Sequence, residues 1–311
     1  MQDNWEREAL NQLLQAGIKE QRRTRRWGIF FKLLGFGYLF VVLALFMGWF
    51  GNRAAEDVNV GPHTALVNLD GVIMAGGEAD VATVAQGLRD AFEDNKTRGV
   101  ILRVNSPGGS PVQSGQLHDE IVRLKKQHPK IPLYVVVEDI CASGCYYTAV
   151  AADKIYADKA SIVGSIGVLM DGFGFTGTME KLGVERRLLT AGENKGFLDP
   201  FSPLSDTQRA KAQEMLGEIH QQFIGVVKTG RGKRLVNDPD LFSGLVWSGE
   251  KSVKLGLIDG LGSVDSVARD VVKAEDIVDF TPQPDYLDRL AKRVGVAAAS
   301  TLGARLDAQL R

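Results

Sequence analysis

An uninterrupted apolar run near the N-terminus is the feature that most constrains what this chain can fold into. No charged side chain occurs over the eighteen residues Leu33–Phe50, and with Lys32 as the one interruption the stretch extends back to Trp27. An α-helix rises about 1.5 Å per residue, so about 20 apolar residues cross the hydrocarbon core of a bilayer. Helices buried in a protein core are rarely uncharged over such a length. Residues 27–50 are therefore expected to form a single transmembrane helix.

A cleaved signal peptide is the competing interpretation of this run. Its apolar region would normally contain about 7–15 residues and would follow a short basic segment. Here the apolar run is longer, and 26 residues precede Trp27. Arg53-Ala54-Ala55 is only a weak cleavage-like sequence. The helix is therefore expected to remain as an uncleaved anchor.

The charges that flank the run predict its orientation. Residues 1–32 carry seven basic and four acidic side chains, with four arginines between positions 22 and 26. Behind the run, Arg53 is the only basic residue close to it. By the positive-inside rule, the N-terminal segment 1–26 is expected in the cytoplasm and the remainder of the chain on the far side of the membrane.

Composition limits the rest of the chain to an ordinary globular domain. The 311 residues are 44% hydrophobic and 24% charged, which excludes a disordered or collagen-like chain. The formal net charge is −1, so nothing indicates a nucleic-acid partner. The two cysteines cannot form a disulfide framework, and no cluster of Cys and His has the spacing of a zinc site. No metal or other cofactor is expected.

Beyond a linker at 51–62, short apolar segments alternate with segments of helical spacing. The expected strands are apolar, often β-branched runs at 64–73, 99–105, 131–139, 154–158, 161–170 and 184–190. The expected helices lie at 80–93, 112–126, 145–152 and 205–227. Strands that alternate with helices of this length indicate βαβ units and a mainly parallel sheet. The sequence therefore predicts an α/β domain.

The C-terminal segment 276–311 has a different character. Pro282 and Pro284 interrupt the chain, and apolar residues then repeat every four positions at Leu302, Leu306 and Leu310. Such a stripe is typical of an amphipathic helix that packs on another surface. We expect this tail to pack on an oligomer of the chain or on the membrane surface, with a frayed terminus as the alternative.

Several common signatures are missing from the sequence. No GxGxxG follows the first strand, and neither GxxxxGK[ST] nor HExxH occurs. Nucleophile chemistry remains, and Ser143 in CASGCYYTA is the clearest candidate. Small neighbours leave its hydroxyl accessible at a strand-to-helix turn, where a helix N-terminus favours developing negative charge. The alternative is a serine that only caps the helix.

A second turn of small residues, 105–110 with the sequence NSPGGS, ends the preceding strand. Carboxyl ends of neighbouring parallel strands meet at one edge of a sheet, where ligands bind. The glycine pair lets backbone N–H groups face a substrate oxygen without interference from side chains. The alternative is an ordinary turn between a strand and a helix.

A serine nucleophile needs a base. None of the four histidines is framed by glycines or apolar neighbours: His63, His118, His128 and His220. A lysine can serve instead when burial lowers its pKa enough to leave it neutral. Lys195 in AGENKGFLDPF differs from most lysines of the chain because glycines flank it and an apolar stretch follows. Judged by spacing alone, a lysine in a surface loop is the ordinary interpretation.

Four motifs in this order resemble the signal peptide peptidase A (SppA) family: NSPGGS, ASGCYYTA, GSIGV and a lysine 52 residues after the serine. The resemblance is to the short, single-copy bacterial members with an N-terminal membrane anchor, and it covers about residues 63–275. It implies a Clp/crotonase-like α/β fold of repeated β-β-α units with a mainly parallel sheet. It also implies that residues 63–275 form a serine endopeptidase domain.

The resemblance assigns a role to each motif. Ser143 would be the nucleophile, Lys195 the general base, and Ser165 the residue that hydrogen-bonds to this lysine and orients it. The backbone amides of Gly109 and Gly144 would form the oxyanion hole. An extended substrate would bind as an added strand beside Gly108, Gly164, Ile166 and Gly167.

The chain departs from the family pattern in two places. Cys145 stands where a glycine is common, and GFLDPFSPL follows Lys195 in place of the more usual Asp-x-Gly-Ser-Pro. The first difference is a small substitution. The second difference affects the shape of the loop that carries Lys195 and of any pocket that this loop lines.

The same resemblance implies the setting of the enzyme. Its substrates would be released signal peptides and other extended apolar peptides, and its sites would lie between neighbouring copies of a homo-oligomeric ring. The helix at 27–50 would anchor it once in the bacterial inner membrane, with the catalytic domain in the periplasm. Two other interpretations stay open: a crotonase-type acyl-thioester enzyme, which would not need Ser143, and a non-catalytic membrane scaffold.

Cys141 and Cys145 flank the predicted nucleophile. A thiol nucleophile would lack a histidine nearby in the sequence. A disulfide is possible in an oxidising compartment, but residues four apart across a helix start rarely orient both Cβ atoms suitably. We therefore expect two buried thiols.

Overall fold

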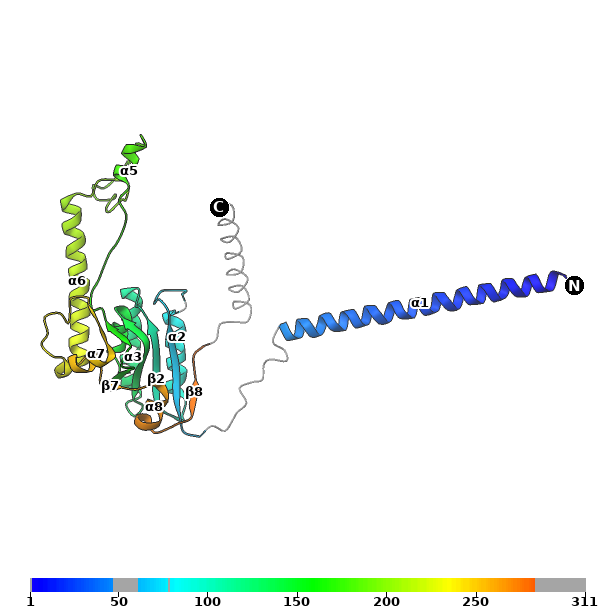
Figure 1. Ribbon diagram of the computed structural model, residues 1–311, viewed down its shortest axis with the longest axis horizontal. Helices are drawn as coiled ribbons and strands as arrows, with labels where there is room; N and C mark the ends of the chain where they lie inside the picture. Colours follow the sequence, from blue (N-terminus) through cyan, green and yellow to red (C-terminus); the bar gives the residue numbers. More distant parts are fainter. Residues whose placement is uncertain (1, 47–60, 78, 283–311) are drawn as a thin grey trace. The chain divides into compact units, whose positions relative to one another are not determined.

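A computed structural model describes residues 2–46, 61–77 and 79–282 of the chain. These residues fall into two separate units, the helix α1 (Gln2–Phe46) and an α/β unit formed by residues 61–282 (Figure 1). Most of the predicted linker at 51–62 and the predicted apolar stripe of the C-terminal tail lie outside the described residues.

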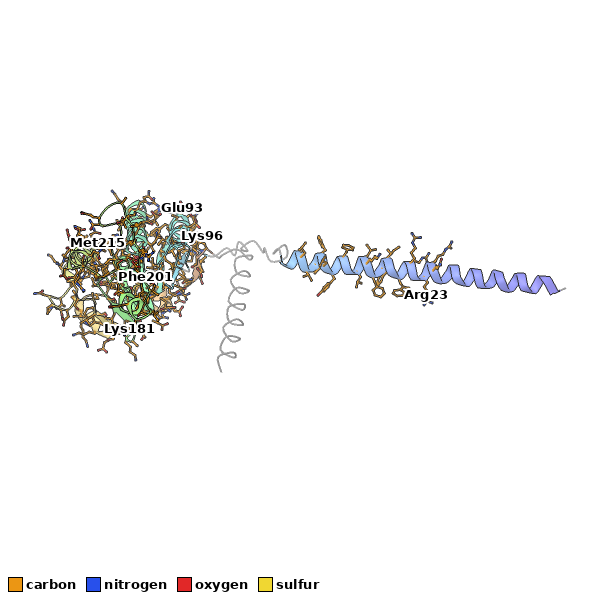
Figure 2. All side chains as sticks on the ribbon, turned by 90° about the horizontal axis from the view of Figure 1, so that it is seen from above. Arg23, Glu93, Lys96, Lys181, Phe201 and Met215 are labelled. Atoms are coloured by element: carbon orange, nitrogen blue, oxygen red, sulfur yellow. A yellow bond between two sulfur atoms is a disulfide. The ribbon has the colours of Figure 1, made fainter. Side chains whose placement is uncertain are left out.

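Helix α1 contains most of the predicted anchor. Its segment Gln21–Ala44 has 24 residues and is long and apolar enough to cross a membrane. At about 1.5 Å per residue the segment is about 36 Å long, enough for a hydrocarbon core of about 30 Å. Figure 2 shows the side chain of Arg23 projecting from the N-terminal end of this segment. Residues 47–50 of the predicted span lie outside the described residues.

The α/β unit is built on one mainly parallel sheet, as predicted. Its strands follow the order β6-β5-β3-β2-β1-β8, with β4 beside β3 and β7 beside β4. Every pair is parallel except β5 with β6. The strands are β1 (His63–Asp70), β2 (Thr97–Ser106), β3 (Leu133–Ala142), β4 (Lys154–Ala157), β5 (Ile162–Gly164), β6 (Val246–Ser248), β7 (Gly260–Leu261) and β8 (Ile277–Asp279).

Polar side chains cap the N-termini of the longer helices of this unit. Asp80, Ser110 and Ser205 each accept a hydrogen bond from the backbone amide three residues further on, at the starts of α2, α3 and α6. The helices are α2 (Val81–Glu93), α3 (Pro111–Gln127), α4 (Gly144–Ala149), α5 (Thr176–Lys181), α6 (Asp206–Arg231), α7 (Gly249–Leu255) and α8 (Val264–Val267). A 3₁₀ turn, Gly232–Arg234, follows α6, and a π-helical turn, Ala268–Val272, follows α8.

Apolar side chains cover both faces of the sheet, as expected for parallel strands. On one face, alternate residues of β1 to β4 pack with buried side chains of α2, α3, α4 and α6 in the main core. On the other face, Leu66, Ile101 and Val136 form a smaller cluster with Val267 and Ala268 after α8. The sheet is therefore held from both sides, and its carboxyl edge is fixed in place.

Three segments differ from the sequence-based expectation. The strand predicted at 161–170 ends early: β5 stops at Gly164, where the positive φ angles of Gly164 and Ser165 turn the chain, and residues 165–170 form no strand. Residues 184–190 do not form the predicted strand: none of the described residues pairs with them, and Leu189 is 95% exposed. They belong to the segment between β5 and α6, which extends away from the sheet (Figure 1), so no strand edge is available to them. Strand β8, in contrast, pairs with β1 and carries the sheet past residue 275, where the domain was expected to end.

A buried ion pair ties the C-terminal end of α6 to the sheet. Arg231 is 2% exposed, and its guanidinium donates hydrogen bonds to the Asp259 carboxylate (Nη1–Oδ2, 2.7 Å) and to the Gly256 carbonyl (2.9 Å). The same carboxylate accepts from the Ile155 amide of β4 (2.8 Å), and Arg234 contacts its other oxygen (3.1 Å). Burial alone would raise the pKa of Asp259, but these hydrogen bonds and the two positive charges lower it.

Asp259→Asn is expected to lower the free energy of unfolding by about 3 kcal/mol at pH 7, because Arg231 would stay buried without a counter-charge. A carboxylate whose pKa is lowered in the folded state stabilises the fold above its unfolded pKa of about 3.9. That contribution disappears as the pH falls through the folded pKa, so the gap between wild type and variant should close below about pH 4. Urea unfolding of both proteins at a series of pH values checks this. A gap that stays constant down to acid pH would contradict it.

Candidate active site

Three loops meet at the carboxyl edge of the sheet because the strands before them are parallel neighbours. Ser106 of β2 is paired in register with Cys141 of β3, and Ala142 of β3 is paired with Gly164 of β5. The segments NSPGGS, ASGC and GSIGV leave these three strands in that order across the edge. The structure thus brings together three of the four motifs that the sequence singled out.

A cavity of about 540 Å³ opens where these loops meet. Five predicted site residues line it: Gly109, Ser143, Gly144, Ser165 and Gly167. Much of its remaining wall is apolar and includes Tyr147 of α4, Ile219 and Phe223 of α6, and Val168 and Leu169 after β5. Burial raises the pKa of the Tyr147 phenol, so this residue lines the cavity as a neutral group.

Ser143 connects β3 to α4 with an unusual backbone conformation. Its φ is 53°, a value that non-glycine residues seldom adopt. Its amide donates to the Gly164 carbonyl (2.9 Å), and its own carbonyl accepts from the Tyr147 amide (3.0 Å). The serine precedes α4 without any capping hydrogen bond from its side chain, so it is not the simple helix cap considered above. Its hydroxyl remains available to the cavity.

The backbone amides of Gly109 and Gly144 lie close together beside this serine. A Cβ atom on Gly144 would stand 3.2 Å from the Gly109 nitrogen, and a Cβ on Gly108 would stand 2.6 Å from the Gly144 nitrogen. Gly109 itself has no room for a side chain, since its Cβ would fall 2.1 Å from the Ile73 carbonyl oxygen. Among the residues that the structure describes, neither amide donates a hydrogen bond. Two unpaired N–H donors therefore lie at the cavity wall.

Ser165 also has a positive φ, 52°, and sits in a tight turn. Its amide donates to the Leu245 carbonyl (2.7 Å), and its carbonyl accepts from the Gly167 amide (2.9 Å). Gly164 before it packs so closely on the Trp247 ring that a Cβ would come within 2.7 Å. The turn is thus held from the β6 side, with Ser165 facing the cavity.

His220 is a contact of this site that the sequence did not indicate. Its Nε2 lies 3.1 Å from the Ile166 carbonyl oxygen, so α6 is joined directly to the GSIGV segment. The neighbouring Ile219 and Phe223, four positions apart on α6, line the cavity. A spacing of four positions places both on one face of a helix, but nothing in the sequence indicates which loop that face covers.

Most of the residues predicted to bind a substrate strand have backbone carbonyls that already accept hydrogen bonds within the chain. The carbonyls of Gly108, Gly164 and Ile166 already accept from Ile73, Ser143 and His220 respectively. The Ile166 side chain is fully buried in the core. Of the four predicted residues, only Gly167 lines the cavity.

Lys195 does not line the cavity of its own chain. It is exposed in a turn at 191–199, where its amide donates to the Gly192 carbonyl (3.1 Å). This turn belongs to the segment between β5 and α6 that extends away from the sheet (Figure 1). A single copy therefore brings together the serines and glycines of the predicted site but not the lysine.

Cys141 and Cys145 form a disulfide, so the expectation of two free thiols is wrong. Their Cα atoms lie 5.1 Å apart, within the usual range for a disulfide. Cys141 lies at the end of strand β3 and Cys145 in the first turn of helix α4. The positive φ of Ser143 turns the chain sharply between them. The two side chains consequently face each other rather than lying along one continuous helix.

No group of three or more His, Cys, Asp or Glu side chains within the described part of the chain is arranged to hold a metal ion. The chemistry available at the edge of the sheet comes from hydroxyl groups and backbone amides.

A family match covers part of this site. Residues 125–278, which include Ser143, Ser165 and Lys195, match Peptidase family S49. Together with the four ordered motifs, this match confirms the resemblance found in the sequence. The chain fits the SppA family of S49 peptidases.

Individual relatives are similar to this chain over part of their length. A candidate signal peptide peptidase SppA of Enterococcus faecium is 30% identical over 223 residues, 69% of this chain and 64% of that protein. An Na⁺/H⁺ antiporter NhaA of Brucella abortus (strain 2308) is 44% identical over 256 residues, 79% of this chain and 34% of that protein. The chain thus spans from about one third to under two thirds of the length of these curated relatives.

Among solved structures, a mutant of the 1510-N membrane-bound stomatin-specific protease has 15% sequence identity and a TM-score of 0.44. The likeness covers 72% of this chain and 99% of that chain.

The close packing of Gly144 gives a test of this geometry. An alanine Cβ there would stand 2.3 Å from the Ser114 hydroxyl, which itself donates to the Ser110 carbonyl (2.9 Å). Gly144→Ala should therefore lower the free energy of unfolding by about 1–3 kcal/mol. Adding Ser114→Ala removes the clashing oxygen, so the double variant should be more stable than Gly144→Ala alone. Thermal unfolding of the four proteins of this cycle measures the coupling, and simple additivity of the two losses would contradict the clash.

Proposed function

We propose that this chain is a membrane-anchored serine endopeptidase in which Ser143 is the nucleophile and Lys195 the general base. One observation carries the proposal: an uncommitted serine hydroxyl stands beside two unpaired amides on the wall of a cavity. The match to Peptidase family S49 supports peptide-bond hydrolysis as the reaction at this site.

The mechanism follows from these groups. A neutral Lys195 takes the proton from Ser143 while the serine oxygen attacks the peptide carbonyl carbon. The amides of Gly109 and Gly144 then hold the tetrahedral oxyanion, with a contribution of about 3 kcal/mol per donor. The protonated lysine returns its proton to the leaving amine, and an acyl group remains on Ser143. Lys195 next removes a proton from water, which hydrolyses the acyl-enzyme, while Ser165 orients the amine.

The lysine would come from a neighbouring copy of the chain. The segment that carries Lys195 exposes several large apolar side chains, among them Phe173 (80%), Leu182 (72%) and Leu189 (95%). Exposed apolar clusters of this kind indicate a surface that another protein covers. A homo-oligomer in which each segment reaches the cavity of the next copy would cover these side chains and complete the serine–lysine pair.

Extended apolar peptides are the proposed substrates, including signal peptides released into the membrane. The aliphatic and aromatic lining of the cavity supports this choice, because Ile219, Phe223 and Leu169 favour an apolar side chain next to the cleaved bond. The SppA name of the Enterococcus faecium relative agrees with it. An extended peptide would bind along the GSIGV segment beside Gly167, which lines the cavity.

Helix α1 is proposed to cross the bacterial inner membrane once, with its N-terminus in the cytoplasm and the α/β unit in the periplasm. The cluster of arginines before the apolar segment supports this orientation. The disulfide between Cys141 and Cys145 supports it independently, because disulfides persist in oxidising compartments such as the periplasm.

The shared site is tested by complementation between two inactive variants. Ser143→Ala and Lys195→Met should each reduce hydrolysis of an apolar peptide to background, because each removes one half of the pair. Co-expressed in one cell, the two chains should regain roughly a quarter of wild-type activity if subunits of a cyclic oligomer mix at random. Lys195→Arg should not substitute for the lysine, since a guanidinium stays protonated.

In the controls, two copies of the same variant are co-expressed, either Ser143→Ala or Lys195→Met. Both controls should stay inactive. Recovery in none of the mixtures would argue against a site shared between copies. Full activity of Lys195→Arg would exclude Lys195 as the base. Hydrolysis by Ser143→Ala at the wild-type level would exclude Ser143 as the nucleophile. Absence of peptide hydrolysis in the wild type itself would leave the acyl-thioester and scaffold alternatives.

Reporter fusions test the proposed topology. Alkaline phosphatase, which needs an oxidising compartment, should be active when fused after residue 282 and inactive when fused before Arg22. A cytoplasmic fluorescent reporter should show the opposite pattern. Reversal of both results would place the α/β unit in the cytoplasm and contradict the topology.

A further inference from the structure

The disulfide between Cys141 and Cys145 is the one covalent feature beside Ser143 that the mechanism does not use. The two cysteines bracket the serine at a separation of four positions, and both are fully buried. Neither sulfur lines the cavity. A role in binding substrate is therefore excluded for them, and what remains is an effect on the residues that they enclose.

Each end of the disulfide is attached to a different part of the site. Cys141 is paired in register with Ser106 of β2 and with Val163 of β5, so it lies between the strands that carry the other two loops. Cys145 belongs to the first turn of α4 and is followed by Tyr146, whose buried hydroxyl donates to the Leu257 carbonyl (2.6 Å). The disulfide thus joins the centre of the sheet edge to the helix that presents Gly144.

The segment between the two cysteines contains Ser143, whose backbone conformation is strained. The φ of Ser143 is 53° and its ψ is −123°, a combination that a non-glycine residue keeps only when its surroundings enforce it. Two hydrogen bonds hold this residue, from its amide to Gly164 and from the Tyr147 amide to its carbonyl. Both bonds could lengthen together if α4 moved away from the sheet edge.

We infer that the disulfide is a positioning element for the nucleophile: it keeps α4 against the sheet edge, and with it the Ser143 conformation and the Gly144 amide beside Gly109. The inference rests on the proposed peptidase function. A link that closes so short a loop removes little freedom from the unfolded chain compared with links across long loops. Its main effect should therefore be on the geometry of the site and not on the stability of the whole domain.

Reduction of the link provides the cleanest perturbation, because it changes almost no atoms. A dithiol reductant such as dithiothreitol supplies two electrons and two protons, the sulfur–sulfur bond breaks, both cysteines become thiols, and the reductant closes into its own cyclic disulfide. No residue is substituted. Reoxidation by oxidised glutathione reverses the exchange.

The experiment compares oxidised, reduced and reoxidised full-length protein in detergent, with the redox state of each sample measured by mass after alkylation in denaturant. For hydrolysis of an apolar peptide, reduction should lower kcat roughly tenfold or more, because displacements of about 1 Å have effects of this size. KM should change less than twofold, thermal unfolding should shift by only a few degrees, and reoxidation should restore kcat. Amide hydrogen exchange over 141–147 should accelerate on reduction.

The double variant Cys141→Ala/Cys145→Ala is the matched control. Its kcat should equal that of the reduced wild type, and dithiothreitol should have no effect on it. An unchanged kcat in fully reduced wild type would overturn the inference, as would a fall in activity that only accompanies loss of the folded state. If even the oxidised protein hydrolyses no more peptide than Ser143→Ala, the proposed function fails. In that case the exchange measurement still decides the inference: unchanged exchange over 141–147 would overturn it.

Discussion

The parallel pairing of β2, β3 and β5 is the constraint on which the site depends. Parallel strands end at the same edge of a sheet, so the loops that follow them must meet whatever their sequences are. The pairing of Ser106 with Cys141 and of Ala142 with Gly164 fixes which residues meet. These pairings, which on the β2 side follow a shift of register after Val104, bring the Gly109 amide, the Gly144 amide and the Ser143 turn together.

The loops at this edge keep conformations that an isolated chain would seldom adopt. Ser143 and Ser165 both have positive φ angles, and each donates its amide to a carbonyl of a neighbouring segment, at Gly164 and Leu245. Conformational cost at such positions is met by the surrounding packing and clusters at functional sites. Here the surroundings are the sheet edge, the His220 contact from α6 and the ion pair that fixes the end of α6.

The sequence predicted the parts of this fold that depend on local pattern. Runs such as 99–105 and 131–139 are apolar and β-branched, and both became central strands. The run 184–190 has a similar composition but no strand edge to pair with, and composition cannot show whether a partner exists. The disulfide was missed for a related reason: the spacing of Cys141 and Cys145 was judged as the start of a helix, whereas the positive φ of Ser143 places a sharp turn between them. Motif resemblance singled out Lys195, but one chain alone does not bring it to the cavity.

A nucleophilic Ser143 can be identified by covalent labelling. Full-length protein would be treated with a fluorophosphonate, which reacts with activated serine hydroxyls, and the labelled residue would be located by mass spectrometry of proteolytic peptides. One phosphonyl group per chain is expected on Ser143, with a loss of peptide hydrolysis in proportion to labelling. A label on another residue with full loss of activity, or hydrolysis that continues when Ser143 is completely labelled, would contradict it.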